Sequence, residues 1–214
     1  MRTQQIEAWT QALVKSYGKP RKPINTSVFY SEFIRREYTK LVVSITRDMK
    51  LDMKMKIGYV RSGGPTNAPA WVMIPAYIPM LGTNAFRQWT VEMFIRKSFL
   101  EGAPFHAVMS TLSHECAHIL LSSTRHPLAR VEEVVDLTAM FLGYRDIFVQ
   151  GVEYFHMPSL ETISGAVKSI TLENVLDTSA AYRAIEMCTP EERKLGYMST
   201  EEYRFAQKIL ASYR

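Results

Sequence analysis

The chain has 214 residues, of which 47% are hydrophobic and 22% are charged, and this length and balance predict one folded domain with a sizeable core. The formal net charge of +5 permits an acidic partner but is too small to indicate a nucleic-acid-binding protein. Two cysteines cannot make a disulfide framework, and neither a signal peptide nor a run of about 18 apolar residues occurs. We therefore expect a soluble, cytoplasmic protein with no membrane partner.

The first 50 residues are predicted to be helical. Apolar residues at helical spacing over 4–17 predict an amphipathic helix. A loop is expected over 18–23, because two prolines and three basic residues interrupt the pattern there. Helical spacing then returns and continues to residue 49, with Ser27 or Ser31 as the N-terminal cap.

The pattern changes to a period of two at residue 51. Hydrophobic and polar residues alternate over 51–57, which is typical of a half-buried strand. A turn cluster at 62–67 leads to a second, more apolar strand at 70–75. Helical spacing resumes over 86–100. We therefore expect a small sheet between two groups of helices.

The most informative segment is the helix predicted over 105–121, which contains His-Glu-Cys-Ala-His. At 3.6 residues per turn, His114 and His118 lie on one face of this helix, and both imidazoles can reach the same metal ion. Glu115 lies beside the open coordination position, where it can act as general base towards a zinc-bound water. Cys116 points away from this face and is expected to be a small core residue. The segment therefore predicts a zinc site.

A sheet followed by a helix with this motif resembles the zincin metallopeptidases, and the resemblance implies a third ligand elsewhere in the chain. The metzincin branch has a histidine six residues after the second one, but this chain has Thr124 there. His126 comes two residues late and before Pro127, so we expect a loop histidine. Peptide deformylases use an upstream cysteine as ligand, but no cysteine precedes Cys116. Neither of these branches fits.

The gluzincin branch takes its third ligand from a glutamate on a later helix, and a helix predicted to begin near residue 130 offers two. Glu132 and Asp136 share one face, on which the small residues Ala139 and Gly143 would permit a close approach to the motif helix. Glu133 is turned by about 100° towards a bulkier face. We therefore predict Glu132 as the metal ligand, with Asp136 accepting a hydrogen bond from a ligand histidine. Glu133 or Asp136 as the ligand are the alternatives.

Among gluzincins, the short interval between the two metal-site helices resembles the compact bacterial proteins of the ImmA/IrrE type. The resemblance covers roughly residues 50–150, and Cys116 stands where that group frequently has a glycine. It implies an α+β, zincin-like fold, in which a small and mostly antiparallel sheet packs on helices that include the motif helix. It also implies Zn²⁺ as cofactor.

The expected organisation is a single zincin-like domain over 1–214. Its parts are N-terminal helices (1–50), the sheet and metal-site helices (51–150), and a C-terminal helical segment (151–214). Short helices are predicted in the last part at 171–176 and 180–187, and a final helix is predicted to open at Ser199.

The expected activity is hydrolysis of a peptide bond in a protein or peptide substrate. Zn²⁺ bound by His114, His118 and Glu132 would polarise the scissile carbonyl, and Glu115 would move a proton from the attacking water to the leaving amine. An extended substrate would pair with the strand at 70–74.

Three residues are candidates for donating a hydrogen bond to the developing oxyanion: Tyr144, Tyr154 and His156. Two other functions fit the same motif. One is a catalytically silent zincin that binds a protein, or less expectedly a nucleic acid, and uses zinc only for structure. The other is a zinc hydrolase that acts on bonds other than peptide bonds.

Overall fold

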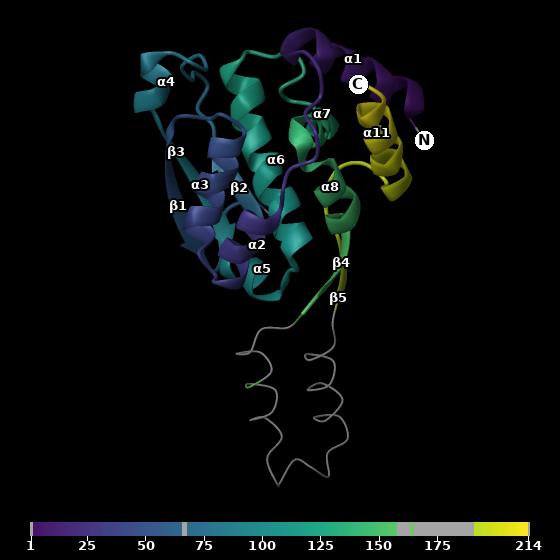
Figure 1. The fold of residues 1–214 in the computed structure, drawn as a ribbon. Helices are drawn as coiled ribbons and strands as arrows, with labels where there is room; N and C mark the ends of the chain where they lie inside the picture. The colour runs from purple at the N-terminus through teal and green to yellow at the C-terminus, as the bar shows by residue number, and fades with distance from the viewer. Residues whose placement is uncertain (1, 66–67, 158–163, 165–190, 214) are drawn as a thin grey trace.

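The computed structural model describes residues 2–65, 68–157, 164 and 191–213, which form a mixed α+β fold in which helices predominate (Figure 1). The helices are α1 (Thr3–Tyr17), α2 (Ser27–Ile34), α3 (Tyr38–Asp48), α4 (Asn84–Gln88), α5 (Lys97–Gly102), α6 (Phe105–Ser123), α7 (Glu132–Ala139), α8 (Arg145–Gly151) and α11 (Thr200–Ser212). The strands are β1 (Lys54–Val60), β2 (Ala70–Met73), β3 (Thr90–Arg96), β4 (Glu153–His156) and β5 (Glu191–Lys194). A π-helical turn, η1 (Met140–Tyr144), joins α7 to α8. The helices predicted at 171–176 and 180–187, together with Cys188, lie outside the described residues.

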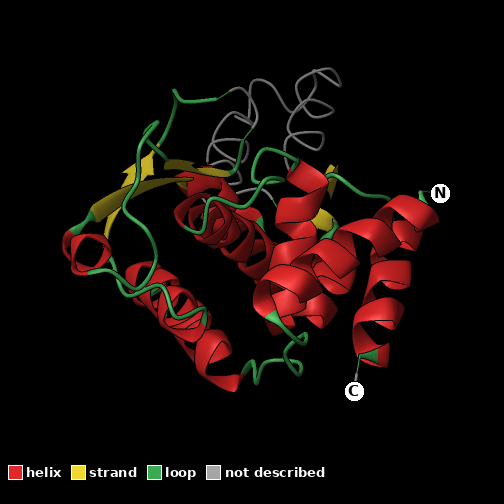
Figure 2. Ribbon diagram, turned by 90° about the horizontal axis from the view of Figure 1, so that it is seen from above, coloured by secondary structure: helices red, strands yellow, loops and turns green. Residues whose placement is uncertain are grey.

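The main sheet has three strands in the order β1, β3, β2. β3 is parallel to β1 and antiparallel to β2, so the sheet is mixed, although the sequence predicted a mostly antiparallel one. β4 and β5 form a separate antiparallel pair. Figures 1 and 2 show the main sheet on one side of α6, and α7, α8 and α11 on the other. β2 is an edge strand, so one row of its main-chain groups is not used by the sheet.

The sequence predicted one helix over 86–100, but the central strand β3 occupies 90–96, so the prediction is wrong there and only its ends lie in helices, α4 and α5. Within the strand, Val91, Met93 and Ile95 are completely buried and alternate with more exposed residues, which is the period of a strand. Aromatic residues at 86, 89, 94 and 99 add apolar positions within the strand and on both sides of it, and these positions also satisfy a helical spacing.

The single helix predicted up to residue 49 is two helices, α2 and α3. The break occurs at Arg36, whose φ of 57° is a left-handed conformation that ends α2. The rings of Phe33 and Tyr38 pack edge to face across this turn, with centroids 6.2 Å apart. Since neither glycine nor proline marks the turn, the sequence pattern alone does not reveal it.

The helices α1 and α11 come from opposite ends of the chain and lie side by side (Figures 1 and 2). The amphipathic helix predicted at 4–17 is confirmed, with Ile6 and Leu13 completely buried. The predicted start of the last helix is also confirmed, because Ser199 and Glu202 form a capping box there. Among the described residues, no helix is both long and apolar enough to cross a lipid bilayer.

Arg2 connects three parts of this helical layer. Its Nε donates a hydrogen bond to Glu202 Oε1 on α11 at 3.1 Å, and its Nη1 forms an ion pair with Glu133 on α7. Its Nη2 also donates to the carbonyl oxygen of Tyr197. The guanidinium lowers the pKa of Glu202 from 4.5 to about 2. A carboxyl whose pKa falls on folding stabilises the native state above its unfolded pKa and loses this effect as the pH falls through the folded pKa.

We therefore expect Arg2→Ala to lower the melting temperature at pH 7 by about 3 °C. The deficit should narrow as the pH falls from about 4.5 through about 2, because below this range Glu202 is protonated in both states. Thermal denaturation followed by circular dichroism at several pH values measures this. Lys15→Ala, which removes an exposed positive charge from α1, is the control. A deficit that stays constant from pH 7 to about pH 3 would assign the effect to packing and not to the ion pairs.

Candidate metal centre

The helix α6 carries the predicted metal-binding motif and is buried along almost its whole length. His114 and Glu115 are each 8% exposed, and the side chain of His118 is 19% exposed. All three line one cleft. Cys116 is completely buried in the hydrophobic core, as predicted for a core residue, and burial raises the pKa of its thiol.

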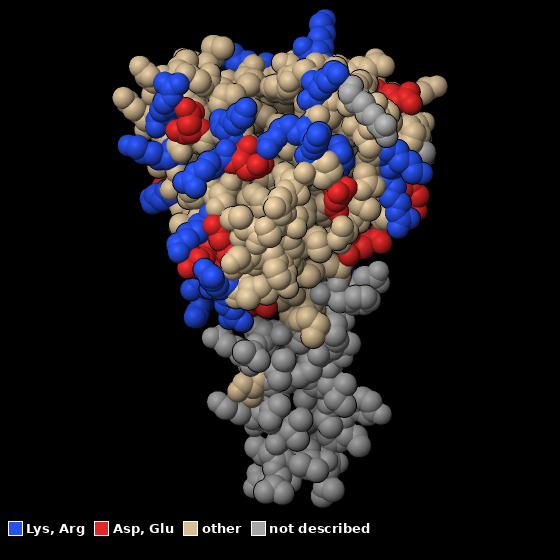
Figure 3. Space-filling model, in the orientation of Figure 1, with Lys and Arg blue, Asp and Glu red and all other residues tan. Residues whose placement is uncertain are grey.

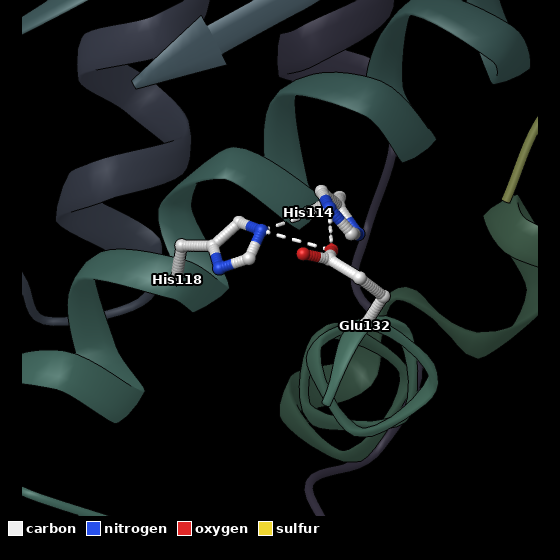
Figure 4. Close-up of side chains that lie close together, drawn as sticks. All are labelled: His114, His118 and Glu132. Carbon is white, nitrogen blue, oxygen red and sulfur yellow. Dashed lines mark hydrogen bonds and ion pairs between the residues drawn. The ribbon is translucent and has the colours of Figure 1, made fainter. Parts of the chain in front are cut away.

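Three side-chain atoms converge between α6 and α7 (Figure 4). The Nε2 atoms of His114 and His118 lie 3.1 Å apart, and Glu132 Oε2 lies 3.3 Å and 3.2 Å from them, respectively. Ligands held tetrahedrally at 2.0–2.1 Å from a zinc ion lie about 3.3 Å from one another. The three atoms therefore have nearly the spacing of three corners of such a site.

The charges around these atoms also favour a bound cation. Glu132 Oε2 is buried between the two imidazoles, within ion-pair distance of both, but it makes no hydrogen bond of good geometry to either of them. The adjacent imidazoles of His114 and His118 lower the pKa of Glu132 to about 2. Burial opposes a charge on His114, but Asp136 outweighs burial and raises the pKa of His114 to about 10. Without metal, His114 therefore carries a second ring proton at neutral pH, and metal binding would release that proton.

Asp136 supports His114 from behind, as predicted. Its carboxylate is 1% exposed, and Oδ1 accepts a hydrogen bond from His114 Nδ1 at 2.7 Å. This bond fixes the tautomer that leaves Nε2 facing the other two donor atoms. Oδ2 accepts from the backbone N–H of Tyr197 at 3.0 Å and from the hydroxyl of Tyr203. Neither tyrosine was among the site residues predicted from the sequence.

Glu133 points away from the imidazoles and pairs with Arg2. The sequence prediction that Glu132 and not Glu133 approaches the histidines is therefore confirmed, although one reason for it is wrong. Gly143 does not face α6: a Cβ there would lie 2.6 Å from the carbonyl oxygen of Lys22. The π-helical turn η1, in which Gly143 has φ 107°, shifts the helical phase, so the face shared by 132, 136 and 139 does not continue to 143.

None of the three predicted oxyanion donors lines the cleft. Tyr144 is completely buried, and its hydroxyl donates to Asp48. Tyr154 and His156 lie on β4, where Tyr154 lines a neighbouring hollow. His126, predicted to be a loop histidine, lies after the end of α6 and stacks on the ring of Tyr17.

Tyr197 reaches the cleft instead, from the loop between β5 and α11. Its ring stacks on the His114 imidazole, with centroids 5.5 Å apart and an angle of 19° between the planes. Burial, together with Glu132, Asp136 and Glu115, raises the pKa of Tyr197 to about 12, so the hydroxyl keeps its proton and can donate it in a hydrogen bond. The only feature of the neighbouring sequence that indicates a turn before Tyr197 is Gly196, whose φ is 82°.

The cleft has a volume of about 680 Å³, with β2 on one side and α6 and the Tyr197 loop on the other. Glu115 projects into it from α6, and its Oε2 accepts a hydrogen bond of 2.9 Å from the backbone N–H of Val72. Burial raises the pKa of Glu115, while the two imidazoles partly oppose this shift. The cleft thus holds a carboxylate of raised basicity beside three potential metal ligands.

The two adjacent glutamates should behave differently when they are mutated. Glu132→Ala removes one of three donor atoms and should weaken metal binding by roughly 100-fold or more. Glu133→Ala breaks an ion pair with Arg2 and should leave metal affinity within about twofold, because such partly exposed pairs contribute little. Competition with a chromogenic chelator measures both affinities. If Glu133→Ala loses the metal and Glu132→Ala retains it, then Glu133 is the ligand and the assignment of Glu132 is wrong.

Asp136→Asn should lower metal affinity by about 10- to 100-fold, the usual cost of losing a supporting carboxylate. A neutral amide accepts a weaker hydrogen bond from His114 Nδ1 than a carboxylate does, so it orients this imidazole less firmly. The amide is also a poorer acceptor for the hydroxyl of Tyr203. The same chelator assay measures the effect, with Asp146→Asn on α8 as the control. If Asp136→Asn instead removes the metal as completely as a histidine substitution, Asp136 is itself a ligand.

No protein-family profile, curated protein or solved structure matches the chain. The likeness to zincins therefore consists of the residues at 114–118, 132 and 136 and of the way in which the structure brings them together.

Proposed function

We propose that this chain is a zinc-dependent metallopeptidase of the gluzincin type, acting on a protein or peptide substrate. The observation that carries the proposal is the position of Glu115. Glu115 lies in the cleft next to His114, His118 and Glu132, but its carboxylate oxygens do not belong to the group of converging donor atoms. A site that used metal only for structure would need neither this carboxylate nor an open cleft.

His114, His118 and Glu132 would hold the metal, and two nitrogens with one carboxylate oxygen are a donor set that suits Zn²⁺. A zinc ion bound there would activate water and polarise the scissile carbonyl. Glu115 takes the proton from the attacking water and delivers it to the leaving amine. Its hydrogen bond to Val72 fixes the carboxylate, so that one oxygen stays in place while the other handles the proton.

Tyr197 is the proposed donor to the oxyanion. Its hydroxyl is protonated, and its ring is held on one side by stacking on His114. The backbone N–H of the same residue is bound to Asp136, so the loop position is fixed from within the metal-binding network. A donor that is positioned before the reaction stabilises negative charge without reorganisation.

The edge strand β2 would hold the substrate. The carbonyl oxygen of Pro69 accepts a hydrogen bond from the backbone N–H of Arg96 on β3. In an antiparallel pair such positions alternate, so the main-chain groups of residues 69, 71 and 73 face β3. The main-chain groups of Ala70, Val72 and Ile74 therefore face outward, towards the cleft that these residues line. An extended peptide can add to such an edge as a further strand.

Elemental analysis of purified protein, combined with comparative proteomics, tests the proposal. Cells that carry the native chain and cells that carry Glu115→Gln should differ in a small set of proteins that have new termini. One zinc per chain and cleavage products that depend on Glu115 are expected. Glu101→Gln, an exposed change on α5, is the control. A zinc-containing protein with identical termini in both cell types would support the silent binding module instead.

A further inference from the structure

Tyr197, the proposed oxyanion donor, depends on its backbone for its position. One face of its ring stacks on the His114 imidazole, but the residue is 52% exposed, so the packing around the ring is incomplete. The direction of the hydroxyl is therefore set by the place where the loop backbone is held. On one side of the residue, the backbone N–H donates to Asp136 Oδ2 at 3.0 Å and to the hydroxyl oxygen of Tyr203 at 3.1 Å.

The backbone carbonyl of Tyr197 is held by a different residue, Arg2, which directly precedes α1. Arg2 Nη2 donates to this carbonyl oxygen in a long hydrogen bond of 3.4 Å. The guanidinium is itself fixed by the buried residue Glu202, because its Nε and Nη2 donate to Oε1 and Oε2 of that carboxylate at 3.1 Å and 3.2 Å. A bidentate pair of this kind determines the orientation of the guanidinium as well as its place.

The third nitrogen of the guanidinium connects the loop to the metal-binding helix. Nη1 forms an ion pair with Glu133 on α7, and Glu133 directly follows the proposed ligand Glu132. One side chain therefore contacts three elements: α7, which supplies a proposed ligand, the start of α11, and the loop that carries Tyr197. These contacts relate the position of the proposed donor to that of the proposed ligand from outside the cleft.

The carboxylate of Glu202 also holds the end of the same loop. Its Oε2 accepts a hydrogen bond from the backbone N–H of Ser199 at 2.9 Å, in addition to the bond from Arg2. Without the guanidinium, the carboxylate would lose its charged partner, and the loop would be loosened at two points. One is the carbonyl of Tyr197, and the other is the N–H of Ser199. The N–H of Tyr197 would stay bound to Asp136, so the loop should become mobile without leaving the site.

These contacts, and not the charge of Arg2 alone, connect this residue to the site. Arg2 is not among the residues that line the cleft, so it reaches the site through the loop and through α7. It is one of 26 lysines and arginines, and Figure 3 shows acidic side chains interspersed among the basic ones on the face seen there. The removal of one such charge should change the overall field little.

We infer that Arg2 is a positioning residue for the proposed reaction, which holds the backbone of Tyr197 so that its hydroxyl stays beside the metal site. This inference rests on the proposed peptidase function, because it assigns a role towards the proposed donor of that same site. A donor stabilises a developing oxyanion only from about 3 Å away, so a small displacement of the loop weakens its effect strongly.

A double-mutant cycle on hydrolysis tests the inference. The substrate is a fluorogenic mixture of randomised peptides of about ten residues, which span roughly 33 Å when extended. The zinc-loaded chain is assayed for kcat/KM well below its melting temperature. Tyr197→Phe should lower kcat/KM by about 100-fold, the scale for the loss of one oxyanion donor. Arg2→Ala should lower it by about 10-fold in the native chain but by less than about twofold in the Tyr197→Phe chain, because residues that act through one group are not additive. Lys15→Ala on α1 is the control and should leave kcat/KM unchanged.

Arg2→Lys separates the geometry of this side chain from its charge. Lysine can pair with one carboxylate, but it lacks the planar fork that reaches Glu202 and the carbonyl of Tyr197 together. The variant should keep most of the melting temperature of the native chain but lose about 5-fold in kcat/KM. It takes the place of Arg2→Ala in the cycle if that variant does not fold. Full activity of Arg2→Lys would show that charge alone is required and would overturn the inference.

Fluorine NMR of protein labelled with fluorotyrosine reports the position of Tyr197 without hydrolysis. The resonance of Tyr197 is the one that is missing in Tyr197→Phe. Zinc should shift it in the native chain, because the ring lies on the imidazole of a proposed ligand. Arg2→Ala should move this resonance towards that of free fluorotyrosine and weaken its response to zinc. The resonance of Tyr59 on β1, assigned in the same way, is the control and should not respond to Arg2→Ala.

The outcomes separate the inference from the proposed function. The inference would be overturned by an equal loss on Arg2→Ala in both chains, by full activity of Tyr197→Phe, or by a Tyr197 resonance that Arg2→Ala does not change. In each of these cases, cleavage that depends on Glu115 would leave the peptidase function standing. No cleavage by the native, zinc-loaded chain would overturn the peptidase function. A Tyr197 resonance displaced by Arg2→Ala would then support Arg2 as the residue that positions this loop over a binding site.

Discussion

His118→Ala protein is expected to purify without zinc, whereas the native chain should contain one zinc ion per molecule. The substitution removes one of three converging atoms and leaves Glu132 Oε2 with a single imidazole neighbour. Metal that binds only the folded state at about 1,000 times its dissociation constant stabilises that state by about 4 kcal/mol. For a chain of this size, the loss corresponds to roughly 10 °C in melting temperature.

Inductively coupled plasma mass spectrometry measures the zinc content, and differential scanning fluorimetry with and without a chelator measures the stability. The chelator should destabilise the native chain by the same amount but leave His118→Ala unchanged. His106→Ala makes the same substitution in the same helix, outside the cleft, and should retain its zinc. Full zinc content in His118→Ala would remove the basis for the metal centre.

Glu115→Gln should retain zinc and the fold but lose peptide hydrolysis by roughly 100-fold or more, the scale of general-base catalysis. The amide oxygen can still accept the hydrogen bond from Val72, so the edge strand and α6 remain connected. What the variant lacks is a basic oxygen that can take a proton. The loss should therefore appear in kcat, with little change in KM.

Hydrolysis of the substrates found by proteomics, measured at saturating concentration, tests this expectation, with Glu101→Gln as the control. An unchanged kcat with full zinc content would show that Glu115 is not the base. A fall in zinc content together with kcat would instead assign Glu115 to metal binding, and the ligand set would have to be revised.

The convergence of the three candidate metal ligands could be predicted from sequence because it depends on local geometry. His114 and His118 are one helical turn apart, and Glu132 follows only 14 residues after His118 on the next helix. Tyr197 could not be predicted in this way. It comes from a distant loop that α11 and the β4–β5 pair bring to the cleft, and its role depends on contacts with His114 and Asp136.

The fold was less predictable for two physical reasons. The strand β3 alternates between buried and more exposed residues, but Phe94 on its less buried face and the aromatic residues that flank the strand also satisfy a helical spacing, so its period of two is obscured. The turn at Arg36 and the phase shift at Gly143 depend on backbone conformation and on tertiary neighbours. Hydrophobic spacing records which residues are buried, but it does not record such interruptions.

The hydrogen bond from Val72 to Glu115 would also limit how tightly the proposed polypeptide substrate is held along β2. Because this amide is already in use, the strand can donate to a substrate at Ala70 and Ile74 but not between them. The carbonyl of a substrate residue opposite Val72 would therefore lack the hydrogen bond that it would receive in a regular β-ladder. This carbonyl could then rotate and become tetrahedral during attack without breaking a bond to the strand. The hydrogen bond between Val72 and Glu115 would thus leave the scissile peptide unit free to change its geometry, while the units on either side of it stay bound to β2.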